Sequence, residues 1–194
     1  MATIELNRLV MAGPMRWIAL TTGGRVTTLA WFVKVVYTAY GAGTVLFCRS
    51  DLYGRGHDDL FAVFSDNLRM SRHLRDDVFY YSAFAGTAPL VEATFESQDS
   101  WPHCIVEKMV AGAPSGGPGG TTLTLTFWDL GVPVAYLRQV DERLTEVGAY
   151  AVPGRFALAI DGVVPVGQAG VGPLAEAPPV GADLQNLWYS SAGG

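Results

Sequence analysis

Two glutamates and a histidine lie close together in the segment EATFESQDSWPHCIVEK, residues 92–108. If the segment folds as a hairpin, Glu92 and Glu96 share one face of the first strand, and His103 begins the second strand. A histidine titrates near neutral pH, so a histidine paired with a carboxylate can move a proton during an isomerisation, dehydration or cyclisation. We therefore take His103, Glu92 and Glu96 as candidate catalytic residues. The alternative is a solvated outer wall, on which these glutamates and Glu107 face water.

Six further residues are candidates for ligand binding. Lys34 interrupts the apolar stretch WFVKVV. Inside a barrel this lysine could lose its charge and act as a base, whereas on an outer face it would keep its ammonium group in water. His57 lies in a loop beside two aspartates, although helix capping also accounts for the aspartates. Aromatic residues could line an apolar pocket or fill the core. The aromatic candidates are Trp31, Tyr80, Trp101 and Trp128.

The motifs that would indicate a metal or a cofactor are not found in the sequence. The histidines do not occur at H-x-H, H-E-x-x-H or H-x₃-H spacing, and no C-x-x-C pair is present. A glycine-rich phosphate loop, a dinucleotide fingerprint and a G-x-S-x-G elbow are also missing. We therefore predict no metal and no cofactor, and we set aside the serine hydrolase, NTPase and Rossmann classes.

The composition predicts one globular domain spanning residues 1–194. Hydrophobic residues make up 49% of the chain and charged residues 16%, which is too apolar for disorder. The net charge of -5 disfavours nucleic acid as a partner. No apolar run approaches the ~20 residues of a membrane helix, and the N-terminus lacks a signal-peptide pattern. We expect a cytoplasmic, soluble protein and no membrane partner, and a homodimer stays open.

The elements that must position the candidate residues are mostly strands. Segments rich in Val, Thr and aromatic residues, separated by glycine turns, predict eight to ten strands from residue 16 onward. Apolar residues at helical spacing predict one long helix at 59–74. A short helix is expected at 3–12, either as a lid or as a strap across the core. The Gly-, Ala- and Pro-rich residues 168–194 are expected to form a loosely ordered tail.

This pattern of elements favours a mainly β fold, an antiparallel β-barrel of the calycin or lipocalin kind with one packed α-helix. The alternative is an open α+β sheet with the helix across one face. Inward residues of a small closed barrel can wall a ligand cavity.

Such a cavity favours a cofactor-free enzyme that acts on an apolar small molecule, as an isomerase, cyclase or lyase. Two lysines among 13 basic residues are typical of a GC-rich bacterial genome, and we expect a role in bacterial secondary metabolism. The alternatives are a carrier or a protein-interaction module. An enzyme needs a cavity with at least two convergent titratable groups, a carrier needs an almost wholly apolar cavity, and an interaction module needs an exposed apolar patch.

Overall fold

The computed structural model describes residues 8–112, 120–170 and 178–190, which are mainly β. The strands are β1 (Arg8–Ala12), β2 (Met15–Thr22), β3 (Arg25–Val35), β4 (Tyr37–Thr38), β5 (Gly43–Ser50), β6 (Leu60–Ser65), β7 (Leu90–Ser100), β8 (Cys104–Ala111), β9 (Thr121–Leu130), β10 (Val134–Gln139), β11 (Leu144–Ala151), β12 (Pro153–Ile160), β13 (Gln168–Ala169) and β14 (Val180–Ser190). A short helix, α1 (Leu68–His73), continues into a π-helical turn, η1 (Leu74–Val78).

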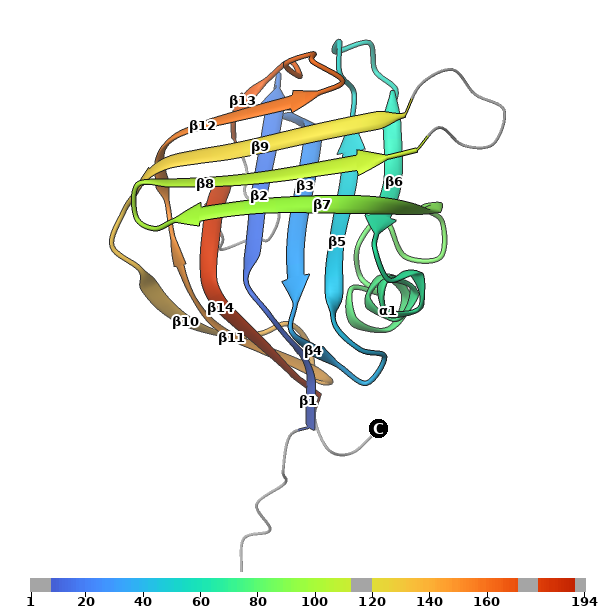
Figure 1. Ribbon diagram of the computed structural model, residues 1–194, viewed down its shortest axis with the longest axis vertical. Helices are drawn as coiled ribbons and strands as arrows, with labels where there is room; N and C mark the ends of the chain where they lie inside the picture. The colour runs from blue at the N-terminus through green and yellow to red at the C-terminus, as the bar shows by residue number, and fades with distance from the viewer. Residues whose placement is uncertain (1–7, 113–119, 171–177, 191–194) are drawn as a thin grey trace, which may run out of the picture.

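The strands form one sheet that folds over on itself. Its order is β10-β11-β14-β2-β3-β5-β6-β7-β8-β9-β12, while β1 pairs with β14 and β4, and β13 pairs with β2. Neighbours are antiparallel except β6 and β7, whose short parallel pairing joins the two layers. Figure 1 shows β7, β8, β9 and β12 crossing in front of β14, β2, β3, β5 and β6. Two sheet layers that cross steeply bury their facing side chains between them.

The first hydrophobic core lies between these two layers. Because side chains alternate along a strand, every second residue of β3, β5, β8 and β9 points into it. Its large members include Ile18, Phe32, Leu46, Ile105, Met109, Leu123, Leu125 and Phe127. The outward residues of β9 are half-buried and include Thr122, Thr124 and Thr126, so this strand has an apolar inward face and a mostly polar outward face.

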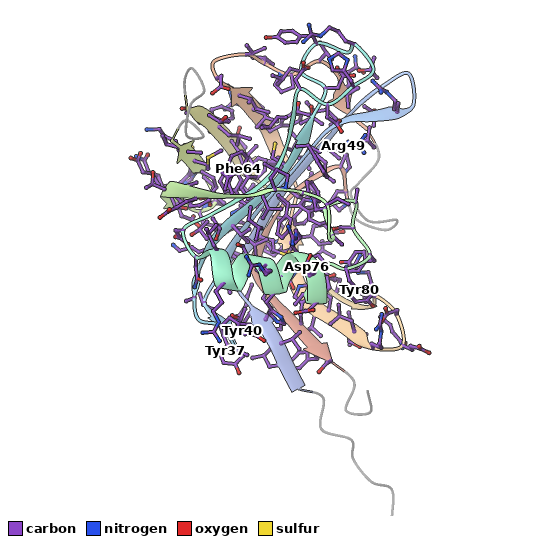
Figure 2. All side chains as sticks on the ribbon, turned by 90° about the vertical axis from the view of Figure 1, so that its right-hand side faces the viewer. Tyr37, Tyr40, Arg49, Phe64, Asp76 and Tyr80 are labelled. Atoms are coloured by element: carbon purple, nitrogen blue, oxygen red, sulfur yellow. The ribbon has the colours of Figure 1, made fainter. Side chains whose placement is uncertain are left out.

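The second core lies on the opposite face of the central strands. The alternate residues Val45 and Phe47 of β5 pack there with Trp31, and α1, η1 and the following residues 79–88 cover them. Figure 2 shows the helical segment from the side, with Asp76 at its end, Tyr80 beyond it, and Tyr37 and Tyr40 below its start. Strands β3, β5 and β6 are therefore buried on both faces, which explains their continuous apolar runs.

The prediction of a mainly β chain is confirmed. Closure into a barrel is not, because the path of paired strands ends at β10 and β12 and these two do not pair in the described part of the chain. The open sheet named as the alternative fits this arrangement.

Three expected segments differ from the structure. Residues 60–65 of the expected helix form strand β6, and only 68–78 are helical. Residues 8–12 are a strand rather than part of a lid helix, while residues 1–7 lie outside the described part. The expected tail contains β14, which pairs with β1, β2 and β11 inside the sheet. Among the described residues, no helix has the length and apolar character needed to span a membrane.

Candidate functional site

A cleft opens between the two layers where β7 and β8 cross β2 and β3. Its volume is about 120 Å³. Charged and polar side chains from both layers line it, together with two apolar residues. The lining residues are Pro14, Arg16, Phe32, Lys34, Thr44, Ser97, Asp99 and Glu107.

Glu107 is the acid of this cleft that lies deepest. It occupies an inward position of β8 between Ile105 and Met109, and it is 9% exposed. The Ser97 hydroxyl, directly opposite on β7, donates a 2.5 Å hydrogen bond to Glu107 Oε2. Burial raises the pKa of the Glu107 carboxyl, and the Ser97 hydrogen bond and the charges of Arg16 and Lys34 only partly oppose this rise. The carboxyl is therefore biased toward its neutral form.

Arg16 enters the same space from β2 and is 5% exposed. Its Nη2 donates to Asp99 Oδ2 at 3.2 Å, and its Nη1 donates to the main-chain carbonyls of Met15 and Asp183. Its Nε lies 3.9 Å from Glu107 Oε1, too far for a hydrogen bond. Nε is also buried and has no hydrogen-bond partner among the described residues. A buried donor without a partner is unfavourable, so a small shift of Glu107 or a bound polar group would stabilise the site.

Lys34 stands at the mouth of the cleft. It lies two residues after Phe32 on the same face of β3, opposite Thr44 of β5, and its side chain is exposed. Within residues 8–112, 120–170 and 178–190, its ammonium group forms no hydrogen bond or ion pair. Its charge acts on the nearby Glu107 carboxyl.

A second group of polar side chains is buried under β10, β11 and β14. Asn186 Nδ2 lies 2.7 Å from Tyr136 Oη, 2.5 Å from Glu146 Oε1 and 2.8 Å from Asp183 Oδ2. The Tyr136 hydroxyl lies 2.8 Å from Glu146 Oε1 and 3.2 Å from Asp183 Oδ2. Arg138 forms an ion pair with Glu146. Two carboxyl groups therefore meet around one hydroxyl and one amide.

Asp183 is the more perturbed of these two acids. Burial and the neighbouring Glu146 carboxylate raise the pKa of Asp183 to about 7, against the hydrogen bonds of Asn186 and Tyr136. Burial and the same two carboxylates also raise the pKa of Tyr136 far above its usual range. Tyr136, Glu146, Asp183 and Asn186 do not line the cleft between the layers, so this group is less suited to binding a ligand there.

The three residues proposed as catalytic are not brought together. Glu96 lies opposite Lys108 on the outer face of the β7–β8 hairpin and forms an exposed ion pair with it at 3.3 Å. Glu92 is exposed at the start of β7, and His103 is exposed in the turn before β8. The register places Ser100, not a glutamate, at the end of the hairpin opposite Cys104. Their roles in catalysis stay predictions, but the expected His–carboxylate contact is absent among these residues.

The candidate binding residues are scattered, and only Lys34 lines the cleft. Trp31 is buried in the second core against Phe47, Phe79 and Phe84. Tyr80 packs at the edge of that core. Trp101 packs against the first core. Trp128 lies on the outer face of β9, where the Arg155 guanidinium covers its ring. His57 is an exposed loop residue whose Nε2 lies 3.8 Å from Asp59 Oδ1.

Sequence reasoning missed Arg16 and Asp99, and it placed Glu107 on the same face as Glu92 and Glu96, as either a solvated wall or a polar-lined cavity. The register was the missing information. On β8 the residues Ile105, Glu107, Met109 and Ala111 alternate with Cys104, Val106, Lys108 and Val110, so each face carries one charged residue among apolar ones. Only pairing with β7 shows that the face carrying Glu107 points inward.

Comparisons of the chain with protein-family models, curated proteins and solved structures found no match in any of the three. The described fold and cleft therefore define only a class: a mainly β protein with two crossed sheet layers and a polar cleft between them.

Proposed function

We propose that this protein binds a small molecule in the cleft between the layers and moves a proton on it, in the manner of a cofactor-free isomerase or lyase. The observation that carries the proposal is Glu107, an acid buried among apolar residues yet lining an open cleft beside two cations. The expected enzyme class is retained, and the proton-transferring residue is reassigned from His103 to Glu107.

The geometry supports general acid–base chemistry. A carboxyl whose pKa is raised toward the working pH can take a proton from one atom of a substrate and return it to another. In an isomerisation, Glu107 would remove a proton from the carbon beside a carbonyl and then reprotonate the resulting enolate at a different atom. The positive charges of Arg16 and Lys34 would stabilise the negative charge that develops on the enolate oxygen.

The lining of the cleft also favours an enzyme over a carrier of apolar molecules. A carrier needs a cavity lined almost wholly by apolar residues, whereas Pro14 and Phe32 are the apolar members of this lining. The volume of about 120 Å³ is well below the ~300–1,000 Å³ of pockets for drug-sized ligands. We therefore replace the apolar metabolite expected from sequence by a smaller, polar one.

The proposal is tested by hydrogen–deuterium exchange. Butanone and 2-oxobutanoate are incubated with the protein in D₂O, and proton NMR follows the loss of hydrogens beside the carbonyl. Glu107→Gln keeps the size and the Ser97 contact but cannot move a proton, and it should slow the exchange by roughly 10²–10⁴-fold. Ser97→Ala should change the pH profile of exchange, since it removes a hydrogen bond that favours the charged carboxylate.

Parallel variants separate the two assignments of the proton-transferring group. His103→Gln and Glu96→Gln remove two of the three candidates derived from sequence, and neither residue lines the cleft. If either of them abolishes exchange while Glu107→Gln retains it, the assignment to Glu107 is wrong. If the wild-type protein exchanges neither compound faster than buffer, proton transfer on small carbonyl compounds is refuted.

A further inference from the structure

Two cations and two acids line the cleft, but not all of their donors have an acceptor among the described residues. The two terminal nitrogens of Arg16 have hydrogen-bond partners. Asp99 accepts a hydrogen bond from Nη2 at 3.2 Å, and two main-chain carbonyls accept hydrogen bonds from Nη1. Both oxygens of Asp99 have partners, since the second one accepts a hydrogen bond from the main-chain N–H of Trp101 at 3.1 Å. These two residues form one neutral pair.

Glu107 and Lys34 remain after that pair is set aside. The Ser97 hydroxyl occupies one oxygen of the Glu107 carboxyl. Lys34 has no hydrogen bond or ion pair anywhere in the described ranges, and it lines the cleft beside Thr44. The cleft therefore presents two cationic donors, the Lys34 ammonium group and the buried Arg16 Nε, that no described residue accepts from.

The rest of the lining limits the size and polarity of what can bind. Phe32 and Pro14 form an apolar side of the cleft, next to the stem of Lys34. The main-chain N–H of Lys34 donates to the Pro14 carbonyl at 3.0 Å, which fixes the two residues relative to each other. A volume of about 120 Å³ is small for a ligand site, so a chain of only a few carbons fits.

We propose that the ligand of the cleft is a short-chain organic monoanion, a carboxylate that pairs with Lys34 while its hydrocarbon part lies on Phe32 and Pro14. The inference rests on the proposed function, because it places the carbon next to the anionic group within reach of Glu107. The unpartnered Nε of the almost fully buried Arg16 adds a second donor at the same site. The anion class follows from the two unsatisfied cationic donors, Lys34 and Arg16 Nε, and the short chain follows from the volume.

The chain offers a matched control, because it contains only two lysines, Lys34 and Lys108. Lys108 lies on the outer face of β8 and is paired with Glu96. Reductive methylation with ¹³C-formaldehyde labels both side chains and the N-terminal amine and keeps their positive charges, and the two lysine resonances are assigned with Lys34→Met and Lys108→Met. Propionate, propionamide and propylammonium have similar sizes and different charges, and each is titrated into the labelled protein.

Propionate should shift the Lys34 resonance in a saturable way and leave the Lys108 resonance in place. Lys34→Met should weaken propionate binding to the unlabelled protein by at least tenfold by calorimetry, Lys34→Arg should retain it, and Lys108→Met should leave it unchanged. Propionamide and propylammonium should bind at least tenfold more weakly than propionate. Equal binding of all three, binding of propylammonium alone, or equal shifts at both lysines would overturn the anion assignment.

The exchange assay separates a failure of this inference from a failure of the proposed function. If exchange of butanone depends on Glu107 but propionate does not bind, the proton chemistry stands and the ligand class is wrong. If propionate binds through Lys34 but neither carbonyl compound exchanges, the ligand class stands and the proton chemistry is wrong.

Discussion

Replacement of Asp183 by asparagine should change how the stability of the protein depends on pH. Asp183 is 1% exposed, and its Oδ1 has no hydrogen-bond partner among the described residues. Its Oδ2 is held by Asn186 at 2.8 Å and by Tyr136 at 3.2 Å. The charges nearby are the Glu146 carboxylate, which opposes ionisation, and Arg16, which favours it. The ionised form of Asp183 is therefore disfavoured in the folded protein.

The sign of the effect follows from proton binding. Burial and Glu146 raise the pKa of Asp183 from 3.8 to about 7, so the folded state holds a proton that the unfolded state releases between these values. The contribution of Asp183 to stability is fully present below pH 4 and is lost as the pH rises to about 7. At about 1.4 kcal/mol per unit, a shift of roughly three units corresponds to about 4 kcal/mol as an order of magnitude. The pKa of Glu107 is also raised, so part of the fall in stability with rising pH should persist in the Asp183 variant.

The assay is urea unfolding followed by tryptophan fluorescence at several pH values between 4.5 and 8.5. Asparagine is neutral at every pH and matches the protonated acid in shape. Asp183→Asn should therefore flatten the fall in unfolding free energy between pH 4.5 and 7, and it should be more stable than the wild type at pH 8. Asp129→Asn is the control, because Asp129 is exposed and its carboxylate pairs, among the described residues, with exposed Arg155. A control of this kind should leave the slope unchanged.

Two results would contradict this reasoning. If Asp183→Asn keeps the wild-type slope, Asp183 is not the group that titrates between pH 4.5 and 7. If the variant is less stable than the wild type at pH 8, the ionised carboxylate contributes more through its hydrogen bonds than it costs through burial beside Glu146.

Three further predictions concern packing. Phe84→Ala should lower the unfolding free energy by ~3–5 kcal/mol in chemical denaturation, because Phe84, in the segment 79–88 that follows the helix, is fully buried in the second core. Gly181→Ala should lower it by ~1–3 kcal/mol or more, because a Cβ there would overlap the Trp17 indole, whereas Gly112→Ala has open space and should have little effect. Deletion of residues 1–12 should lower the melting temperature, since it removes strand β1, and an unchanged melting temperature would restore the lid interpretation.

Much of the strand content could be predicted because local patterns are strong where one face is buried. Thr122, Thr124 and Thr126 alternate with Leu123 and Leu125 in β9, and the leucines are fully buried as expected. The pattern is less informative where both faces are buried. In β6 the run LFAVFS has apolar residues at helical spacing and also at every position between, and tertiary burial decides in favour of a strand.

The position of β14 could not be predicted from local sequence. Its neighbours are β2 near the start of the chain and β11, and both pairings join segments that are distant in sequence. Gly181 and Ala182 were interpreted as tail residues because they are small. In the structure, the Trp17 indole occupies the space that a side chain at position 181 would need. Small residues in this segment thus allow close packing rather than disorder.

The candidate site could not be predicted from local sequence either, because distant strands bring its residues together. The structure also explains why the cleft, and not the Asp183 group, is the better place for chemistry. Both locations hold a buried acid with a raised pKa. Asp183 accepts hydrogen bonds from Asn186 and Tyr136, and this arrangement joins three strands. Both places keep an unsatisfied polar atom among the described residues, Asp183 Oδ1 in one and Arg16 Nε in the other. The difference is access, because Glu107 lines a cleft that leads to exposed Lys34 and Asp183 does not line it. A buried acid is available to a ligand where its site opens to solvent.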